Sequence, residues 1–237
     1  PGEAMHVLDT SPIPNIAWLS RPVRLIIICG IVLICAVMAA TGVLLLNLRD
    51  RDLAESERRL NGLALVLAEQ IDRNLQSIEV IQTAVIERMR GFGIESAEHL
   101  ERQMSGYDTH QRFKDLISAL PHINSLVLTD AHGKLINFSR SWPIPSVKAP
   151  DHDPSEAFKS DPRLTFHVGA PLRGPASGNW VVLVARKFTG PTGAFLGVVT
   201  GAMELAYFEK MFEAVAISPN ESISLFRRDG TLLVRYP

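Results

Sequence analysis

The chain has 237 residues and a mass of 26.1 kDa, enough for one large domain or two small ones with a hydrophobic core. Apolar residues make up 46% and charged residues 21%, which excludes a mainly disordered protein. The 24 basic and 25 acidic residues leave a net charge of −1, so the basic excess typical of nucleic-acid-binding proteins is absent. A mean hydropathy of +0.12 is high for this much charge and indicates a concentrated apolar segment.

That segment is residues 25–48, which contain no charged side chain. As a helix it would be roughly 36 Å long, enough to cross a hydrocarbon core of roughly 30 Å. A buried core helix would show a polar face, which is missing here. A cleaved signal peptide would have a shorter apolar region, whereas this one continues past the candidate cleavage site at Val37-Met38-Ala39. We therefore predict an uncleaved transmembrane helix preceded by a short tail, residues 1–24.

A long amphipathic pattern follows the apolar segment. Large apolar residues recur every three or four positions from Leu60 to Met89, with neither glycine nor proline after Leu63. A helix over residues 52–90 would be roughly 58 Å long, more than a small domain needs. Two interpretations stay open: a core helix of an ordinary domain, or a stalk that packs on a lobe and pairs with a second copy of itself.

The segment after this helix has the pattern of an α+β lobe. Gly91 and Gly93 end the long helix, and a second amphipathic helix is predicted over residues 96–120. A hairpin follows, and a loop rich in proline and aspartate, residues 142–163, includes one helical turn near residues 155–159. Strands are predicted over residues 125–129, 135–139, 164–170, 179–188 and 194–203, and a helix over 205–215. Their short connections predict an antiparallel sheet of about five strands with helices on one face.

One internal similarity bears on the domain organisation. Residues 125–137 and 222–234 align without a gap, with Gly133 over Gly230. Either two hairpins are alike by chance, or a second lobe of the same kind begins near residue 221. We expect a stalk and second helix over residues 49–120, a lobe over 121–220, and the first hairpin of a truncated second lobe over 221–237.

The ordered pattern resembles bacterial transmembrane receptors that carry an extracytoplasmic double Cache (PDC, PAS-like) sensor. The residues behind the resemblance are LALVLAEQIDRNLQSIEVI (63–81), LVLTDAHGKLI (126–136), GVVTG (197–201) and SLFRRDGTLLVRYP (224–237). It implies an N-terminus on the inner side of the bacterial inner membrane and a periplasmic sensor that binds a small molecule in its membrane-distal lobe. It also implies an output module beyond this chain, such as a histidine kinase or a cyclic di-GMP GGDEF/EAL domain. The alternative is a membrane-tethered enzyme or structural module without a sensory role.

No catalytic motif appears in the sequence. The seven histidines form no HExxH pair, and both cysteines, Cys29 and Cys35, lie in the apolar segment. Walker A, GxGxxG and GxSxG sequences do not occur. The run 151–153 (Asp-His-Asp) could hold a metal, but adjacent side chains rarely point at one ion, so we expect a solvated loop. The sequence predicts no catalytic residue, metal or cofactor in this chain, and leaves open whether the full-length protein is an enzyme.

The candidate ligand site lies around the loop at residues 142–163. It combines aromatic side chains with fixed charges, which suits a small organic anion. Its members are Arg140, Trp142, His152, Asp153, Phe158, Phe166, Arg173, Trp180 and Arg186. The alternative is core packing for the aromatic residues, most clearly for Trp180 beside its valine-rich strand, and a solvated surface charge for the arginines. Amino-acid sensors of the resembled family carry an aspartate where this chain has Ala202, which argues against an α-amino acid.

Overall fold

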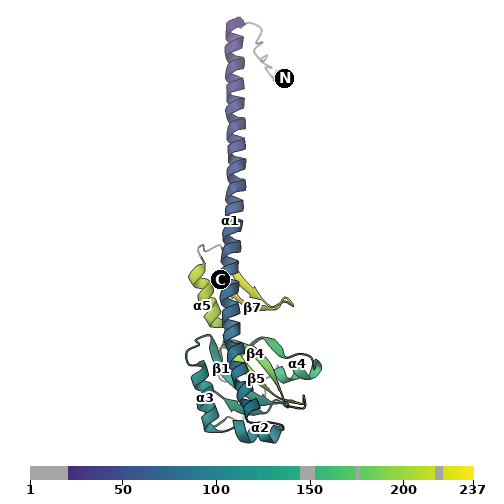
Figure 1. The fold of residues 1–237 in the computed structure, drawn as a ribbon. Coiled ribbons are helices and arrows are strands. Elements are labelled where there is room, and N and C mark those ends of the chain that lie inside the picture. The colour runs from purple at the N-terminus through teal and green to yellow at the C-terminus, as the bar shows by residue number, and fades with distance from the viewer. Residues whose placement is uncertain (1–20, 145–152, 175–176, 217–220) are drawn as a thin grey trace, which may run out of the picture. The chain divides into compact units, whose positions relative to one another are not determined.

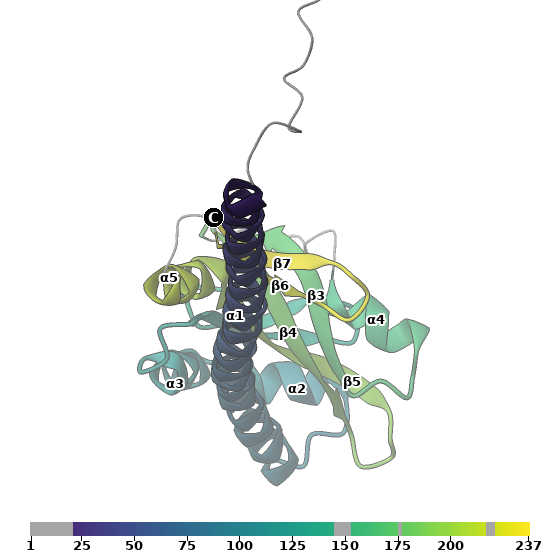
Figure 2. The same cartoon turned by 90° about the horizontal axis from the view of Figure 1, so that it is seen from above.

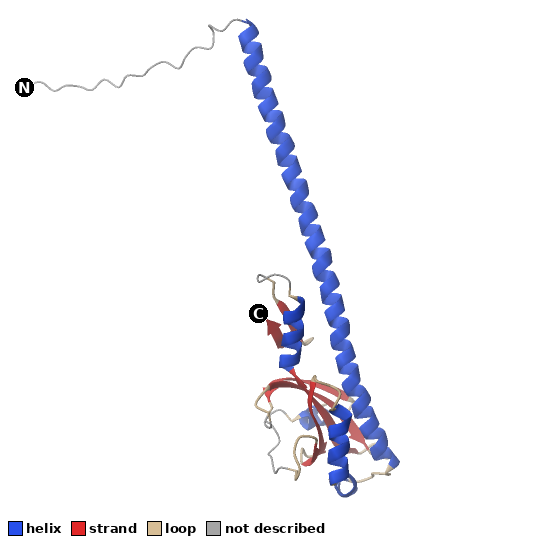
Figure 3. Cartoon of the chain, turned by 90° about the vertical axis from the view of Figure 1, so that its left-hand side faces the viewer, coloured by secondary structure: helices blue, strands red, loops and turns tan. Residues whose placement is uncertain are grey.

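The computed structural model describes residues 21–144, 153–174, 177–216 and 221–237 (Figure 1). The chain divides into two compact units, Pro1–Ala64 and Leu65–Pro237. One helix, α1 (Arg21–Gly91), contributes residues to both units and is 71 residues long. Figure 3 shows this helix in blue as a single uninterrupted element.

The N-terminal part of α1 exposes its apolar side chains. Among the described residues, one helix is long and apolar enough to cross a membrane, and none of its most apolar window is buried. Ile26 and Met38, for example, are 70% and 72% exposed. A core helix would bury such side chains, so the exposure supports the predicted transmembrane segment.

The C-terminal part of α1 is a core helix of the second unit. Ile78, Val85 and Met89 are buried in the main core, whereas Leu60, in the first unit, is 52% exposed. The two interpretations of the long apolar stripe therefore apply to different stretches. The lobe covers the stripe from Leu67 onward. The stalk interpretation therefore applies only to the residues before Leu67.

The predicted helix over residues 96–120 is wrong, because the chain forms two helices there. α2 (Ala97–Met104) starts at the Ser96 cap, whose hydroxyl accepts from the backbone N–H of His99 at 3.2 Å. α3 (Tyr107–Ile117) follows after a break at Gly106. The buried side chain of Asn137 donates to the carbonyl oxygens of Met104 and Gly106, at 2.6 and 3.1 Å. The bond to Met104 satisfies a carbonyl that a continuous helix would have used itself, whereas the Gly106 carbonyl also accepts from the backbone N–H of His110 at 3.3 Å.

The sheet is the predicted antiparallel, five-stranded one, in the order β2-β1-β5-β4-β3. Its strands are β1 (Ile123–Asp130), β2 (Leu135–Phe138), β3 (Phe166–Arg173), β4 (Trp180–Thr189) and β5 (Phe195–Glu204). The remaining helices are α4 (Pro154–Ser160) and α5 (Leu205–Val215). The α+β fold class is thus confirmed, and α5 has the bounds that the sequence predicts.

The two faces of the sheet are covered differently. On one face, here called the helix face, Val184, Val199 and Met203 join the main core with residues of α1, α2, α3 and α5. The other face, here called the α4 face, packs Ala185 and Val198 against Phe158 of α4. Figure 2 shows α3 and α5 on one side of the lobe and α4 on the other. The prediction that helices cover one face therefore holds except for α4.

A hairpin, β6 (Ile223–Phe226) and β7 (Leu232–Tyr236), forms a separate two-stranded sheet. Val234 is buried in the main core, and Nη1 of Arg227 donates to the carbonyl of Val168 on β3 at 2.8 Å. The hairpin inferred from the internal similarity is therefore present. Its assignment to a second lobe remains a prediction.

Candidate functional site

A row of side chains crosses the α4 face through all five strands. Strand register places His167 opposite Ala185, Ala185 opposite Thr200, Thr200 opposite Val127, and Val127 opposite Phe138. Because side chains alternate between faces along a strand, these five share the face of Ala185. The imidazole of His167 at one end of the row and the phenyl ring of Phe138 at the other are thus separated by small or medium residues at its centre.

The centre of the α4 face is built from small side chains. In the next row, Leu183 lies opposite Ala202, and Ala202 opposite Ser125. Ser125, Thr200 and Ala202 are each 5% exposed. We call Ser125, Ala185, Thr200 and Ala202 the small-residue patch. Its two hydroxyl groups lie among larger apolar and aromatic side chains, a composition usual in small-molecule sites.

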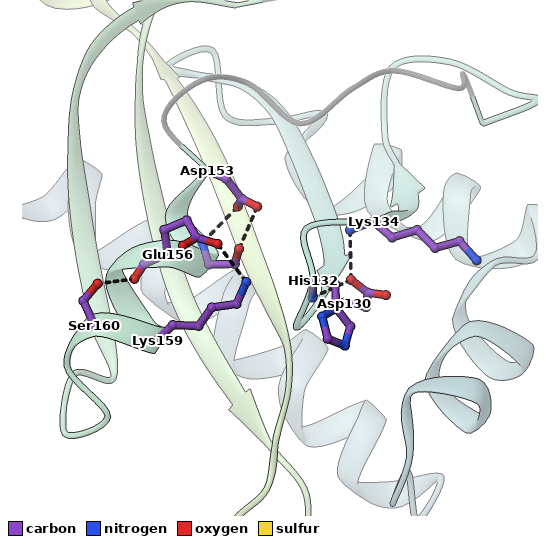
Figure 4. Close-up of polar contacts among 8 residues, drawn as sticks. Asp130, His132, Lys134, Asp153, Glu156, Lys159 and Ser160 are labelled. Atoms are coloured by element: carbon purple, nitrogen blue, oxygen red, sulfur yellow. Dashed lines mark hydrogen bonds and ion pairs between the residues drawn. The ribbon is translucent and has the colours of Figure 1, made fainter.

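Helix α4 is held in place by its own capping residues. Asp153 caps the helix: its carboxylate accepts from the backbone N–H of Ser155 at 2.9 Å and from the Ser155 hydroxyl at 2.6 Å. Lys159 pairs with Glu156 at 2.7 Å, as Figure 4 shows. The predicted site residue Asp153 therefore has a structural role that occupies both of its oxygens. The same figure shows Asp130 accepting from backbone N–H groups of the β1–β2 turn.

Phe158 is the part of α4 that reaches the sheet. It is 1% exposed, and its ring lies 6.2 Å from that of Phe195 and 6.4 Å from that of His167. The core-packing alternative applies to this residue. Phe158 also packs on Ala185, a member of the small-residue patch.

Arg186 and Phe166 lie together, but away from the α4 face. Arg186 lies on the same face of β4 as Val184 and Phe188, which belong to the main core of the helix face. Its Nη2 lies 3.0 Å from Oε2 of Glu79 on α1, and its guanidinium lies 5.4 Å from the centre of the Phe166 ring. This arginine is paired by α1 and does not face the small-residue patch.

Arg173 and Trp180 form a second pair at the end of the β3–β4 ladder. The guanidinium lies 5.3 Å from the indole centre, and its Nη1 donates to the carbonyl of Gly178 at 3.2 Å. Trp180 is 50% exposed, so the expectation that it is a core residue is wrong. As the first residue of β4, it lies outside the buried run that Val181 begins.

Trp142 belongs to a third group, beside α3. Its ring lies 5.7 Å from that of Tyr107 and 5.8 Å from that of His110, and it is 40% exposed. Arg140 is exposed on the same segment. His152 lies outside the described residues. The predicted site residues thus form several separate groups.

The α4 face includes polar residues that the sequence did not single out. Burial lowers the pKa of the His167 imidazole, and the Arg227 guanidinium lowers it further. With Ser125 and Thr200, this histidine is one of the hydrogen-bonding groups of the face. The period-two alternation predicts which residues of each strand share a face. The strand order that brings these three residues together cannot be read from one sequence.

Metal-binding chemistry finds no support in the described part of the chain, where no group of three or more histidine, cysteine, aspartate or glutamate side chains is placed to hold an ion. Asp151 and His152, two members of the run considered in the sequence, lie outside the described residues.

Comparisons with known proteins give structural neighbours only. No protein-family model matches the sequence, and no curated protein matches it. The extracellular domain of rpHK1S-Z16, a protein assigned as a histidine kinase, is 27% identical, with a TM-score of 0.62 over 78% of this chain and 72% of that one. The ligand-binding domain of the Pseudomonas aeruginosa amino-acid chemoreceptor PctC, in complex with GABA, is 15% identical, with a TM-score of 0.51 over 76% and 74%. The fold is that of the extracellular ligand-binding domains of histidine kinases and chemoreceptors, which confirms the Cache-type lobe that the sequence predicts.

Proposed function

We propose that this chain is the extracytoplasmic ligand-sensing portion of a membrane signalling receptor, and that its ligand binds on the α4 face. The observation behind the proposal is the small-residue patch at the centre of that face. The hydroxyl groups of Ser125 and Thr200 in this patch can orient a bound molecule. The shared fold with extracellular sensor domains and the exposed apolar stretch of α1 support the same function.

The ligand that fits this surface is a small organic molecule with hydrogen-bonding groups. The hydroxyls of Ser125 and Thr200 can donate to a carboxylate, and His167 can donate or accept. Phe138 and Phe158 supply apolar walls. Ala202 stands where the resembled amino-acid sensors carry an aspartate, so the patch has no carboxylate there to pair with an α-ammonium group. We therefore propose organic acids as the class to test first.

The test is a thermal-shift screen of the whole chain in lipid nanodiscs. Small organic acids, GABA and neutral amino acids form the compound set. A ligand of the α4 face should raise the melting temperature of the wild type, and Ala202→Leu should abolish the shift by filling the patch. Thr200→Val, which keeps the shape and removes the hydroxyl, should weaken binding of an organic acid roughly tenfold to hundredfold, the worth of one hydrogen bond to a charged group.

Trp180→Ala is the matched control, because this exposed residue lies outside the patch and should leave the shift unchanged. Arg140→Ala and Arg173→Ala test the anion site that the sequence predicts around the loop at residues 142–163. A tenfold to hundredfold loss of affinity in these variants would place the anion at those arginines instead. If no compound stabilises the wild type, or if Ala202→Leu responds as the wild type does, the proposed site is wrong. The sensor function would then rest on the shared fold alone.

We also propose that the lobe is periplasmic in the bacterial inner membrane and that the chain forms a homodimer through the stalk part of α1. The first rests on the apolar segment and on the extracellular location of the structural neighbours. The second rests on exposed apolar side chains of α1, including Leu60 and Val66, which are 52% and 66% exposed.

A further inference from the structure

A buried glutamine of α1 is hydrogen bonded to two neighbouring strands of the sheet, β4 and β5. Gln82 is fully buried, and its Nε2 donates to the carbonyl oxygen of Val184 on β4 at 2.7 Å and to that of Val199 on β5 at 3.0 Å. Each carbonyl belongs to the residue just before a member of the small-residue patch, Ala185 or Thr200. Helix α1 is therefore bonded directly to the backbone that presents the α4 face.

Two polar atoms in this region have no partner among the described residues. They are Oε1 of Gln82, an acceptor, and Nε of Arg186, a donor, and both atoms are buried. Arg186 lies directly opposite Val199 in the β4–β5 ladder, and its Nη2 is paired with Glu79, one turn before Gln82 on α1. An unpaired buried donor and an unpaired buried acceptor thus occur in the same layer between α1 and the sheet, a costly arrangement that proteins usually avoid.

We propose that Arg186 has two positions: the observed one, on Glu79, and a second one, in which its Nε–H donates to Oε1 of Gln82. The second position satisfies both unpaired atoms. It releases Glu79, whose side chain is 43% exposed and can be solvated by water, so the loss of that ion pair costs little. Each position satisfies groups that the other leaves free, which is the condition for a two-state contact.

The proposed switch joins the ligand face to α1. Displacement of β4 and β5 by a molecule on the α4 face would move the carbonyls held by Gln82 and change the distance from Arg186 to both partners. This last step rests on the proposed function. The two positions themselves do not, so they can be tested without any ligand.

The test is a double-mutant cycle on the whole chain in nanodiscs, followed by thermal unfolding. In Glu79→Met, Arg186 keeps Gln82 as a partner, and in Gln82→Met it keeps Glu79. The double variant leaves Arg186 with neither, so its melting temperature should fall by more than the sum of the single losses, by about 2 °C or more. Glu101→Gln, which removes the exposed partner of Lys134, is the control and should combine additively with Gln82→Met.

A spectroscopic measurement separates the switch from a static packing role. The ¹⁵Nε signal of Arg186, assigned by its loss in Arg186→Lys, should move in opposite directions in Glu79→Met and Gln82→Met. Additive losses in the cycle, or an Arg186 signal that Gln82→Met leaves unchanged, would overturn the proposal. Both readouts are ligand-free, so a failure of the ligand screen does not affect them.

Discussion

Two glycines on β5 should differ sharply in their tolerance of a methyl group. A Cβ at Gly197 would overlap the backbone oxygen of Thr129 on the neighbouring strand and would lie 3.2 Å from Cδ2 of Leu100. A backbone oxygen cannot rotate away, so Gly197→Ala must push β1 and β5 apart. Overpacking costs about 1–3 kcal/mol, and this case belongs at the upper end, about 3 kcal/mol. For a unit of this size we expect a fall in melting temperature of about 6–12 °C.

At Gly201 the obstacle is a side chain. A Cβ there would lie 3.0 Å from Cγ2 of Ile78 on α1, which can shift by a few tenths of an ångström. Gly201→Ala should therefore cost about 1 kcal/mol, or about 2–4 °C. Gly91, at the end of α1, has no heavy atom of another residue within 4 Å of its added Cβ, so Gly91→Ala is the control and should change the melting temperature by about 2 °C or less.

The assay is thermal unfolding followed by circular dichroism, with the whole chain in nanodiscs. The melting temperature should be highest for Gly91→Ala, lower for Gly201→Ala and lowest for Gly197→Ala. If Gly197→Ala melts at the wild-type temperature, or no lower than Gly201→Ala, the packing of β1 against β5 described above is incorrect.

Four further predictions concern acid stability, the surface pair, topology and assembly. Burial lowers the pKa of His122 below 6.5, so the unfolded chain binds the proton more readily, and stability should fall as the pH drops from about 6.5 towards 5. A series of melting temperatures over this pH range should show a shallower slope for His122→Asn than for the wild type. An equal slope would contradict this prediction. Trp180→Ala and Arg173→Ala should each lower the melting temperature by about 2 °C or less, because both side chains are exposed; a loss of about 6 °C would restore the core interpretation of Trp180. Alkaline phosphatase fused after Pro237 should be active in cells, whereas a fluorescent cytoplasmic reporter at the same junction would reverse the topology. Single cysteines along residues 56–75 should crosslink with a period near 3.5, and flat or absent crosslinking would argue against a stalk dimer.

Local signals predicted most of the fold. The α5 helix follows from apolar spacing at three and four residues, and the strands follow from period-two runs separated by glycine turns, such as the one at Gly133. The break between α2 and α3 was not predicted, because the bonds that stabilise it come from Asn137 on β2. Only a contact between distant segments makes the break favourable, and a single sequence does not reveal such contacts.

The candidate site was less predictable than the fold, since residue type does not specify which face of a sheet a side chain occupies. Arg186 has the same parity along β4 as Val184 and Phe188, so alternation places all three on one face. Which face α4 covers depends on the packing of the whole lobe. The predicted site residues are close to one loop along the chain. They nevertheless come from both faces of the sheet, because distance along the chain does not specify a face.

The alternation that separated those residues also explains how the two faces can communicate. Ala185 and Thr200 lie on the α4 face, while the preceding residues, Val184 and Val199, direct their side chains into the core under α1. A strand cannot shift one of these neighbours without the other, because a single peptide unit joins them. The bonds from Gln82 to both carbonyls therefore make α1 sensitive to the spacing of β4 and β5, and the helix continues without a break to Arg21. A lobe that bound its ligand on the helix face would have to open its main core to do so, whereas binding on the α4 face leaves that core intact.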